Sequence, residues 1–261
     1  MKINSRWKIV LIASFFAWLM EYSLRGINNF LKTPQMAVLV FVNYFVYLAL
    51  IEDFIGRFKL KDYQVWIVAQ FFGLLWQLVS VSAVYYPPFV FGIGLGDLLI
   101  NNLVWWTTIQ TVFATYIAHR LIQNVDRLKP LLGKFGIFVF FVFFVLISAS
   151  WRFFVTPAVT PWQFLVMFSL TFLFAGFSYQ QISSNLKKGV QLAPFEANKF
   201  LDGLSLFTVV FLVFSFFFLT GDGGHSHLIN RQALRVNLVI SPLIALLLLL
   251  KRVIAQKPIP V

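Results

Sequence analysis

The chain has 261 residues, of which 60% are apolar and only 11% are charged, and its mean hydropathy is +0.83. This composition is typical of a membrane protein and excludes an ordinary soluble domain. The absence of cysteine excludes disulfides, thiolate metal sites, iron–sulfur clusters and a cysteine nucleophile. The net charge of +12 would indicate nucleic-acid binding in a soluble protein. Here we interpret it as the excess of Lys and Arg that membrane proteins carry in their cytoplasmic loops.

Eight apolar segments are long enough to cross a membrane as helices. They cover residues 8–24, 36–55, 64–86, 98–119, 135–151, 162–184, 204–220 and 236–250. We therefore predict an all-α, polytopic bundle of about eight transmembrane helices, which forms one transmembrane domain over residues 1–261. The spans at about 8–120 hold most of the intramembrane polarity, whereas those at about 135–250 are rich in Phe and Leu.

The distribution of basic residues predicts the orientation. With the N-terminus in the cytoplasm, sixteen Lys and Arg fall in the inside segments and five in the outside segments. Cytoplasmic loops of membrane proteins carry such an excess. We therefore expect both termini in the cytoplasm, in a multi-pass protein of a prokaryotic plasma membrane, the cell inner membrane.

Charged residues lie near the ends of the first two spans. Glu21 and Arg25 have the i,i+4 spacing of a helical ion pair, which we expect at the outer interface. Alternatively, both share an outward-facing pocket with Asp97. Glu52 and Asp53 close the second span, and we expect a solvated cytoplasmic end there, or else an inner gate or docking surface.

The third span places four small or polar residues on one helix face. Gln70, Gly73, Gln77 and Ser80 follow one another at i, i+3, i+7 and i+10. The glycine would allow a neighbouring helix to approach closely, and the glutamines would bond across the contact. Alternatively, this face lines a polar cavity together with the fourth span.

The fourth span follows two prolines and a run of glycines, which we expect to break the helix before Asp97. At 100° per residue, one face of the span carries polar residues from end to end. These are Asp97, Asn101, Thr108, Thr111, Thr115 and His119, while Asn102, Trp106 and Gln110 lie roughly opposite. A helix that is polar on two sides belongs inside the bundle. Three roles are open for Asp97: it could be the N-cap of this helix, a functional carboxylate or the partner of an arginine.

Two further groups have open interpretations. Trp76, Trp105 and Trp106 fall near mid-membrane beside Asn and Gln residues, either as a packing cluster or as an aromatic-lined ligand site. His225 and His227 could contribute to a metal site. We expect instead a flexible outer loop there, and no metal site or cofactor in the chain.

The sequence Gly94-Leu95-Gly96-Asp97 resembles the Gly-x-Gly-Asp signature of the intramembrane aspartyl proteases. The resemblance implies a second catalytic aspartate on a neighbouring helix. The other aspartate close to a span is Asp53, which the predicted topology places at the opposite membrane face. The Pro-Ala-Leu element of the presenilin branch is absent, because the last span reads Ser-Pro-Leu-Ile-Ala-Leu over residues 241–246.

Our leading hypothesis is a protein that binds or transports a small or amphiphilic substrate in an outward-facing polar pocket between spans 1, 3 and 4. The candidate binding residues are Glu21, Arg25, Gln70, Gln77, Asp97, Asn101, Trp105 and Thr108. A second hypothesis is an intramembrane carboxylate enzyme with Asp97 as candidate catalytic residue, either a Gly-x-Gly-Asp protease or an acid catalyst acting on an isoprenoid-like lipid. A third is a non-catalytic subunit or scaffold. The expected partners are membrane lipids, a small-molecule or lipid ligand and a membrane subunit, but no nucleic acid.

Overall fold

The structure, a computed structural model, describes residues 4–80, 83–122, 125, 129–153, 158–188, 195–219 and 231–254. Over this part of the chain the fold is helical, and the one β-type pairing is an isolated bridge between Val90 and Ile93. The elements are α1 (Ser5–Lys32), α2 (Pro34–Phe58), α3 (Asp62–Ser80), η1 (Ala83–Tyr85), α4 (Leu95–Asp97), η2 (Leu98–Phe113), α5 (Ala114–Leu121), α6 (Lys134–Ser150), η3 (Trp151–Phe153), α7 (Pro161–Lys188), α8 (Lys199–Phe218), α9 (Arg231–Leu248) and η4 (Leu249–Ile254).

Six helical segments of the described chain are long and apolar enough to cross a membrane. They are Ser5–Lys32, Pro34–Phe58, Lys134–Phe153, Pro161–Lys187, Lys199–Phe218 and Gln232–Ile254. This finding confirms the predicted all-helical class and supports a multi-pass membrane protein. The third and fourth predicted spans correspond to α3 and to η2 with α5, which are not among the six, so the number of eight spans stays a prediction.

The ends of the long segments meet at one pole of the molecule, which we call the ion-pair pole. Arg6, at the start of α1, pairs with Glu52 near the end of α2 at 3.0 Å. His119 in α5 approaches the same carboxylate at 3.6 Å. Arg252 of η4 pairs with Asp62 at the start of α3. The start of α1, the ends of α2, α5 and η4, and the start of α3 therefore lie together.

Three more contacts bring the remaining segments to the ion-pair pole. Arg120 of α5 binds Asp202 in the first turn of α8 at 2.9 Å. The N–H of Leu132, just before α6, donates to Asp53 of α2 at 2.7 Å. Asn185, near the end of α7, donates to the carbonyls of Phe58, the last residue of α2, and of Lys59, the next residue. Successive long segments therefore run in alternating directions, as in an up-and-down bundle.

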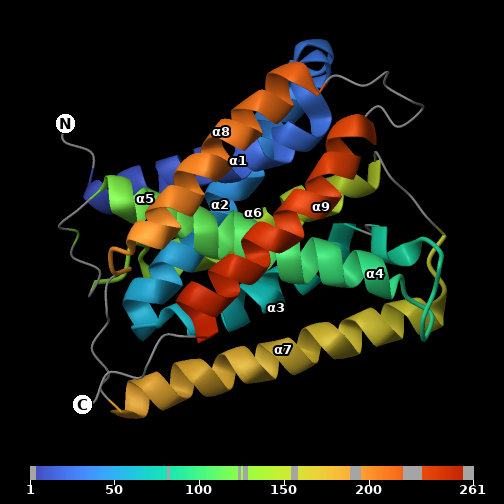
Figure 1. Cartoon of the computed structure of the whole chain (residues 1–261). Helices are drawn as coiled ribbons and strands as arrows, with labels where there is room; N and C mark the ends of the chain where they lie inside the picture. Colours follow the sequence, from blue (N-terminus) through green and yellow to red (C-terminus); the bar gives the residue numbers. More distant parts are fainter. Residues whose placement is uncertain are drawn as a thin grey trace.

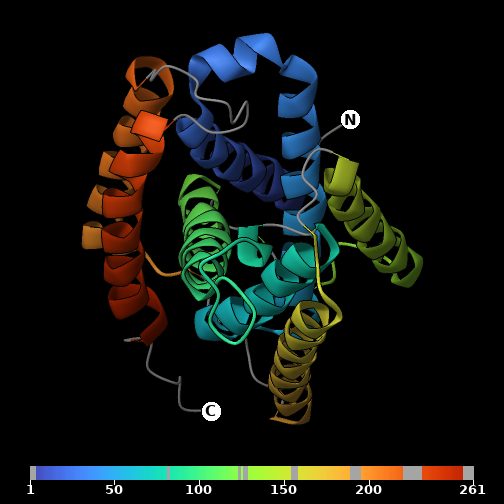
Figure 2. The ribbon, with the colours of Figure 1, turned by 90° about the vertical axis from the view of Figure 1, so that its right-hand side faces the viewer.

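The helix formed by η2 and α5 lies inside this bundle. Every residue from 105 to 118 is buried, and the helix packs against α1, α3 and α9. Figure 2 shows it, in green, between the blue, teal and red segments. The prediction that a helix polar on two sides belongs in the interior is therefore confirmed.

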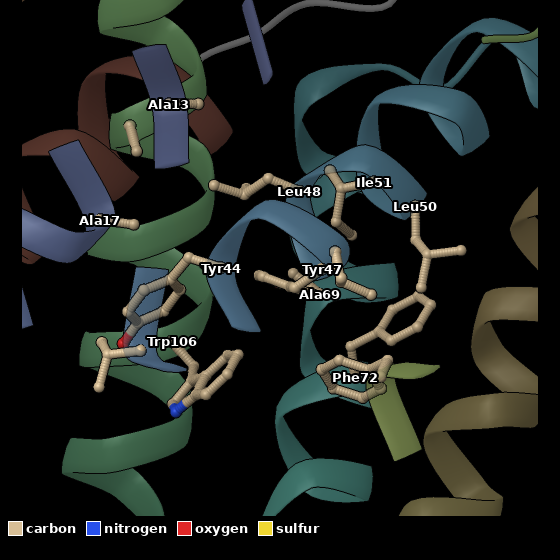
Figure 3. Close-up of a cluster of buried hydrophobic side chains, with 14 of the residues drawn as sticks. Ala13, Ala17, Tyr44, Tyr47, Leu48, Leu50, Ile51, Ala69, Phe72 and Trp106 are labelled. Atoms are coloured by element: carbon tan, nitrogen blue, oxygen red, sulfur yellow. The ribbon is translucent and has the colours of Figure 1, made fainter. Parts of the chain in front are cut away.

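Aromatic side chains fill the space between α2, α3 and η2. The ring of Trp106 lies 5.6 Å from that of Tyr44 and 5.2 Å from that of Tyr47. Phe72 of α3 contacts Tyr47 at 5.8 Å, and the four rings form the centre of the cluster in Figure 3. These contacts fix the place of η2 relative to α2, and thereby the place of the polar side chains that η2 carries.

The Phe-rich helices form the outside of the bundle. The apolar window of α2 is 67% buried, but the corresponding windows of α6 and α7 are only 22% buried. Figure 1 shows α7 along one side of the molecule, where it packs on α3. Exposed phenylalanines on these helices, such as Phe138 and Phe172, suit contact with lipid chains.

One of the first three predicted spans ends earlier in the structure than predicted. The third span does not continue to residue 86, because α3 ends at Ser80. There Arg152 of η3 donates to the carbonyl of Val79 at 2.6 Å, a carbonyl that has no partner within a helix that ends here. The predicted end of the first span, at residue 24, agrees with the structure, because the regular helix is interrupted there by a kink, beyond which a second helical stretch of α1 continues to Lys32. Gly26 stands at that kink with φ of 74°, a conformation that favours glycine.

Candidate functional site

The carboxylate of Glu21 is the centre of a polar cluster. Glu21 lies about 22 Å along α1 from Arg6, at 1.5 Å per residue, and therefore far from the ion-pair pole. Its Oε1 atom is 2.6 Å from Nη2 of Arg25, one turn later in the same helix. The ion pair predicted from the i,i+4 spacing is therefore present.

The second oxygen of Glu21 joins three helical segments. Its Oε2 atom accepts hydrogen bonds from the hydroxyl of Tyr44 in α2 at 3.3 Å and from Nε1 of Trp105 at 3.3 Å. Nε2 of Gln110, also in η2, donates to the same oxygen at 3.4 Å. We call Glu21, Arg25, Tyr44, Trp105 and Gln110 the Glu21 cluster. It lies between α1, α2 and η2, rather than between spans 1, 3 and 4 as predicted.

The helix type of η2 explains why Trp105 and Gln110 both donate to Oε2 of Glu21. Five residues turn an α-helix by about 140° beyond a full turn, so these side chains would point apart. The segment η2 is a π-helix, in which bonds join residues five apart, so side chains at i and i+5 share a side. The hydroxyl of Thr108 repeats this spacing by donating to the carbonyl of Leu103 at 2.6 Å. The two faces predicted at 100° per residue are therefore wrong for this segment.

The Glu21 cluster combines balanced charge with partial access. The side chain of Glu21 is 18% exposed and that of Arg25 is 7% exposed. The ion pair is therefore mostly buried in the protein, but part of it reaches the protein surface. The Oε1 atom of Gln110 is buried, and no donor reaches it within the described part of the chain. The cluster therefore presents a carboxylate and an amide carbonyl, both acceptors, beside the rings of Tyr44 and Trp105.

Two other predicted residues bind η2 to α3. The carboxamide of Asn102 donates to that of Gln70, and Nε1 of Trp66 donates to Thr108 at 3.1 Å. Gly73 lies against Asn102, where a Cβ atom would overlap the Asn102 carboxamide. Of the two interpretations for this face of α3, the contacts of Gln70 and Gly73 match the hypothesis of close helix packing.

The remaining predicted residues lie apart from these contacts. Gln77 is fully buried, and neither its Nε2 nor its Oε1 has a hydrogen-bond partner among the described residues. Asn101 and Asp97 are half-buried. Asp97 is not an N-cap, because the helix already begins at Leu95 with Gly94 as its cap, and the Asp97 side chain makes no capping bond. As a ligand site, the predicted set of eight residues stays a prediction.

A second carboxylate does not accompany Asp97 in the part of the chain that the structure describes. Burial raises the pKa of the Asp97 carboxyl, and no neighbouring acid contributes to that rise. Asp53, at the ion-pair pole, is held by Arg57 at 2.8 Å. Asp222 and the nearby histidine pair lie outside the described residues. The catalytic dyad implied by the Gly-x-Gly-Asp resemblance is therefore not formed between Asp97 and Asp53.

The end of α2 differs from the solvated surface that its charges predicted. Glu52 is 2% exposed and Asp53 is not exposed at all. Arginines from the start of α1 and from α2 itself bind them, because Nε of Arg6 donates to Glu52 at 3.0 Å and Nε of Arg57 donates to Asp53 at 2.8 Å. Buried carboxylates require such partners, and the Arg6–Glu52 pair joins the start of α1 to the end of α2.

Two members of the Glu21 cluster were absent from the predicted set. Tyr44 is a polar residue at mid-depth of an apolar span, which is the signal that could have indicated it. Gln110 stands five residues after Trp105, a spacing that places both on one side only in a π-helix. The sequence contains both residues but does not show that η2 is a π-helix.

Comparisons with protein families, with curated proteins and with solved structures give no match for this chain. The fold and the composition therefore define its class. They indicate a helical membrane protein with several membrane-crossing helices.

Proposed function

We propose that this multi-pass membrane protein binds a small or amphiphilic molecule at the Glu21 cluster, through a head group that donates hydrogen bonds. An amine or a hydroxyl group has this property. The observation that carries the proposal is a carboxylate within apolar helices that three segments share. Ionisable residues within apolar membrane helices are costly and commonly mark a ligand or ion path.

The chemistry of the cluster supports a donor head group. Oε2 of Glu21 accepts three bonds of 3.3 to 3.4 Å, at the long end of the range for hydrogen bonds. A ligand N–H or O–H could replace one of them with a shorter bond. It could also satisfy the buried Oε1 of Gln110, whose lack of a donor is unfavourable in an apolar region. Arg25 already pairs with Oε1, the other oxygen of the carboxylate.

Position also supports an outward-facing site. The Glu21 cluster lies in the half of the bundle away from the ion-pair pole, as the separation of Glu21 from Arg6 along α1 indicates. If the ion-pair pole is cytoplasmic, as the distribution of Lys and Arg predicts, ligands would enter from outside. Binding is the part of the hypothesis that this geometry supports; transport would require a second arrangement of the same helices.

The experiment compares three amphiphiles with the same octyl chain: octylamine, octanol and octyl phosphate. The full chain, reconstituted in nanodiscs, is heated in their presence and its unfolding is followed by tryptophan fluorescence. We expect octylamine or octanol to raise the midpoint with increasing concentration, because ligands that bind the folded state stabilise it. Octyl phosphate should have no such effect.

Two variants test whether Glu21 is responsible for the ligand-dependent rise of the unfolding midpoint. Glu21→Gln should abolish the ligand-dependent rise, while Asp97→Asn, which removes a carboxylate outside the Glu21 cluster, should retain it. If no amphiphile distinguishes the natural chain from Glu21→Gln, the ligand hypothesis is wrong. A large loss of stability in Glu21→Gln alone would then favour the scaffold hypothesis.

A further inference from the structure

We propose that exposed lysines around the ion-pair pole bind the head groups of anionic phospholipids. Arginines and lysines have different contacts at this pole. The described arginines of this pole are bound to carboxylates, in the pairs Arg6–Glu52, Arg57–Asp53, Arg120–Asp202 and Arg252–Asp62. The planar guanidinium suits such fixed pairs. The buried acids of the pole are thus already neutralised by arginine.

Five exposed lysines at the same end of the bundle are not used in this way. They stand on five different elements, α1, α6, α7, α8 and η4. They are Lys8, Lys134, Lys187, Lys199 and Lys251. Within the described residues, none of the five ammonium groups takes part in an ion pair or hydrogen bond, and Lys251 lies 5.5 Å from the ring of Phe200. Five positive charges therefore remain available.

These lysines lie at the depth of lipid head groups. Lys134 and Lys199 are the first residues of α6 and α8, and Lys187 is in the last turn of α7. These three helices belong to the segments long and apolar enough to cross a membrane. The ends of such helices reach the head-group region, where lysine side chains extend toward the interface.

Exposed apolar residues next to these lysines in the sequence favour a lipid over a water-soluble polyanion as the ligand. Phe135 follows Lys134 and is 78% exposed, and Phe200 follows Lys199 and is 46% exposed. Leu186, which precedes Lys187, is 63% exposed. A phospholipid offers a phosphate for the ammonium group and acyl chains for the apolar neighbour. A nucleic acid or an acidic protein segment would leave these apolar side chains in water.

The experiment measures lipid retention by native mass spectrometry of the full chain. Phosphatidylglycerol and phosphatidylcholine with identical acyl chains are offered in equal amounts. We expect the natural chain to retain more phosphatidylglycerol, and the preference to weaken at high salt. In a variant with all five lysines changed to Gln, the preference should fall, by about fivefold for each lysine whose head-group contact is lost. A variant with all five lysines changed to Arg, which keeps the five positive charges, is the matched control and should retain the preference.

Three results would overturn the proposal. They are equal retention of phosphatidylglycerol by the five-glutamine variant, displacement of the lipid by millimolar inorganic phosphate, and an equal loss of the preference in the variant with five arginines. If the variant with five glutamines does not fold, single Lys→Gln variants and the salt dependence of the natural chain test the proposal instead. Each single change and high salt should weaken the preference for phosphatidylglycerol. Glu21→Gln should leave lipid retention unchanged, so this inference and the proposed function fail separately.

Discussion

Trp105 and Gln110, five residues apart in η2, donate to the same carboxylate oxygen of Glu21, at 3.3 and 3.4 Å. This relationship depends on the π-helical geometry of η2. In an α-helix one of the two side chains would turn away from α1, and the carboxylate would lose a donor. The helix type of η2 and the Glu21 cluster are therefore parts of one arrangement.

The Glu21–Arg25 pair should behave as a coupled unit in a double-mutant cycle. Arg25→Met leaves a largely buried carboxylate without its cation and should lower the free energy of unfolding by about 3–5 kcal/mol. Adding Glu21→Gln removes that charge and should recover much of the loss. Denaturant unfolding in mixed detergent micelles measures all four chains. Simple addition of the two single effects would show that the pair is not coupled.

Two arginines of the ion-pair pole should differ strongly in their contribution to stability. Arg6 and Glu52 have side chains only 4% and 3% exposed, so Arg6→Ala should cost about 3–5 kcal/mol. Arg120 and Asp202 are 32% and 37% exposed, and Arg120→Ala should cost at most about 1 kcal/mol. The same unfolding assay compares them. Equal losses would mean that burial of the Arg6–Glu52 pair does not determine its strength.

A glycine pair tests the contact between α3 and η2. Gly73→Ala would press its new methyl group into the carboxamide of Asn102, and such overpacking should cost about 1–3 kcal/mol. Gly203→Ala, in α8, meets nothing within 4 Å. It should be neutral or stabilising by up to about 1 kcal/mol, because alanine favours helix. Tolerance of both changes would argue against close packing at Gly73.

The helices could be predicted from the sequence because their apolar segments are long and continuous. The interior place of η2 could also be predicted, since asparagine, glutamine and threonine at membrane depth require partners. The burial of Glu52 could not be predicted, because its arginine lies 46 residues away in the chain. Local sequence indicated a charged helix end, and only the arrangement of α1 beside α2 turns it into a buried ion pair. The π-helix escaped prediction because apolar periodicity at 100° per residue presupposes an α-helix.

Asp97 should make the protein less stable at neutral pH than in acid. Burial raises the pKa of its carboxyl, so the folded state holds the proton more tightly than the unfolded state. The resulting destabilisation is absent below the unfolded pKa and grows as the pH rises through the folded pKa. Asp97→Asn should therefore stabilise the protein at neutral pH, by less than about 1 kcal/mol, and have no effect in acid. A loss of stability at neutral pH would reveal a favourable role of the charge.

The absence of native cysteine makes the orientation directly measurable. Single cysteines introduced by Lys32→Cys and Lys134→Cys stand at exposed positions at opposite ends of the bundle. With the ion-pair pole in the cytoplasm, a membrane-impermeant maleimide should label Lys32→Cys in intact cells. Lys134→Cys should react only after the cells are opened, because the bilayer excludes the reagent from the inner side.

The reverse labelling pattern would place the ion-pair pole outside and contradict the excess of inside Lys and Arg. It would also change both proposals in a defined way. The Glu21 cluster would then lie in the cytoplasmic half, and its ligand would have to be a cytoplasmic amine or hydroxyl compound. The lysines would face the outer leaflet, where the anionic lipids that attract basic residues in the cytoplasmic leaflet are not the expected partners. The labelling experiment therefore determines which side of the membrane the Glu21 cluster and the five lysines face.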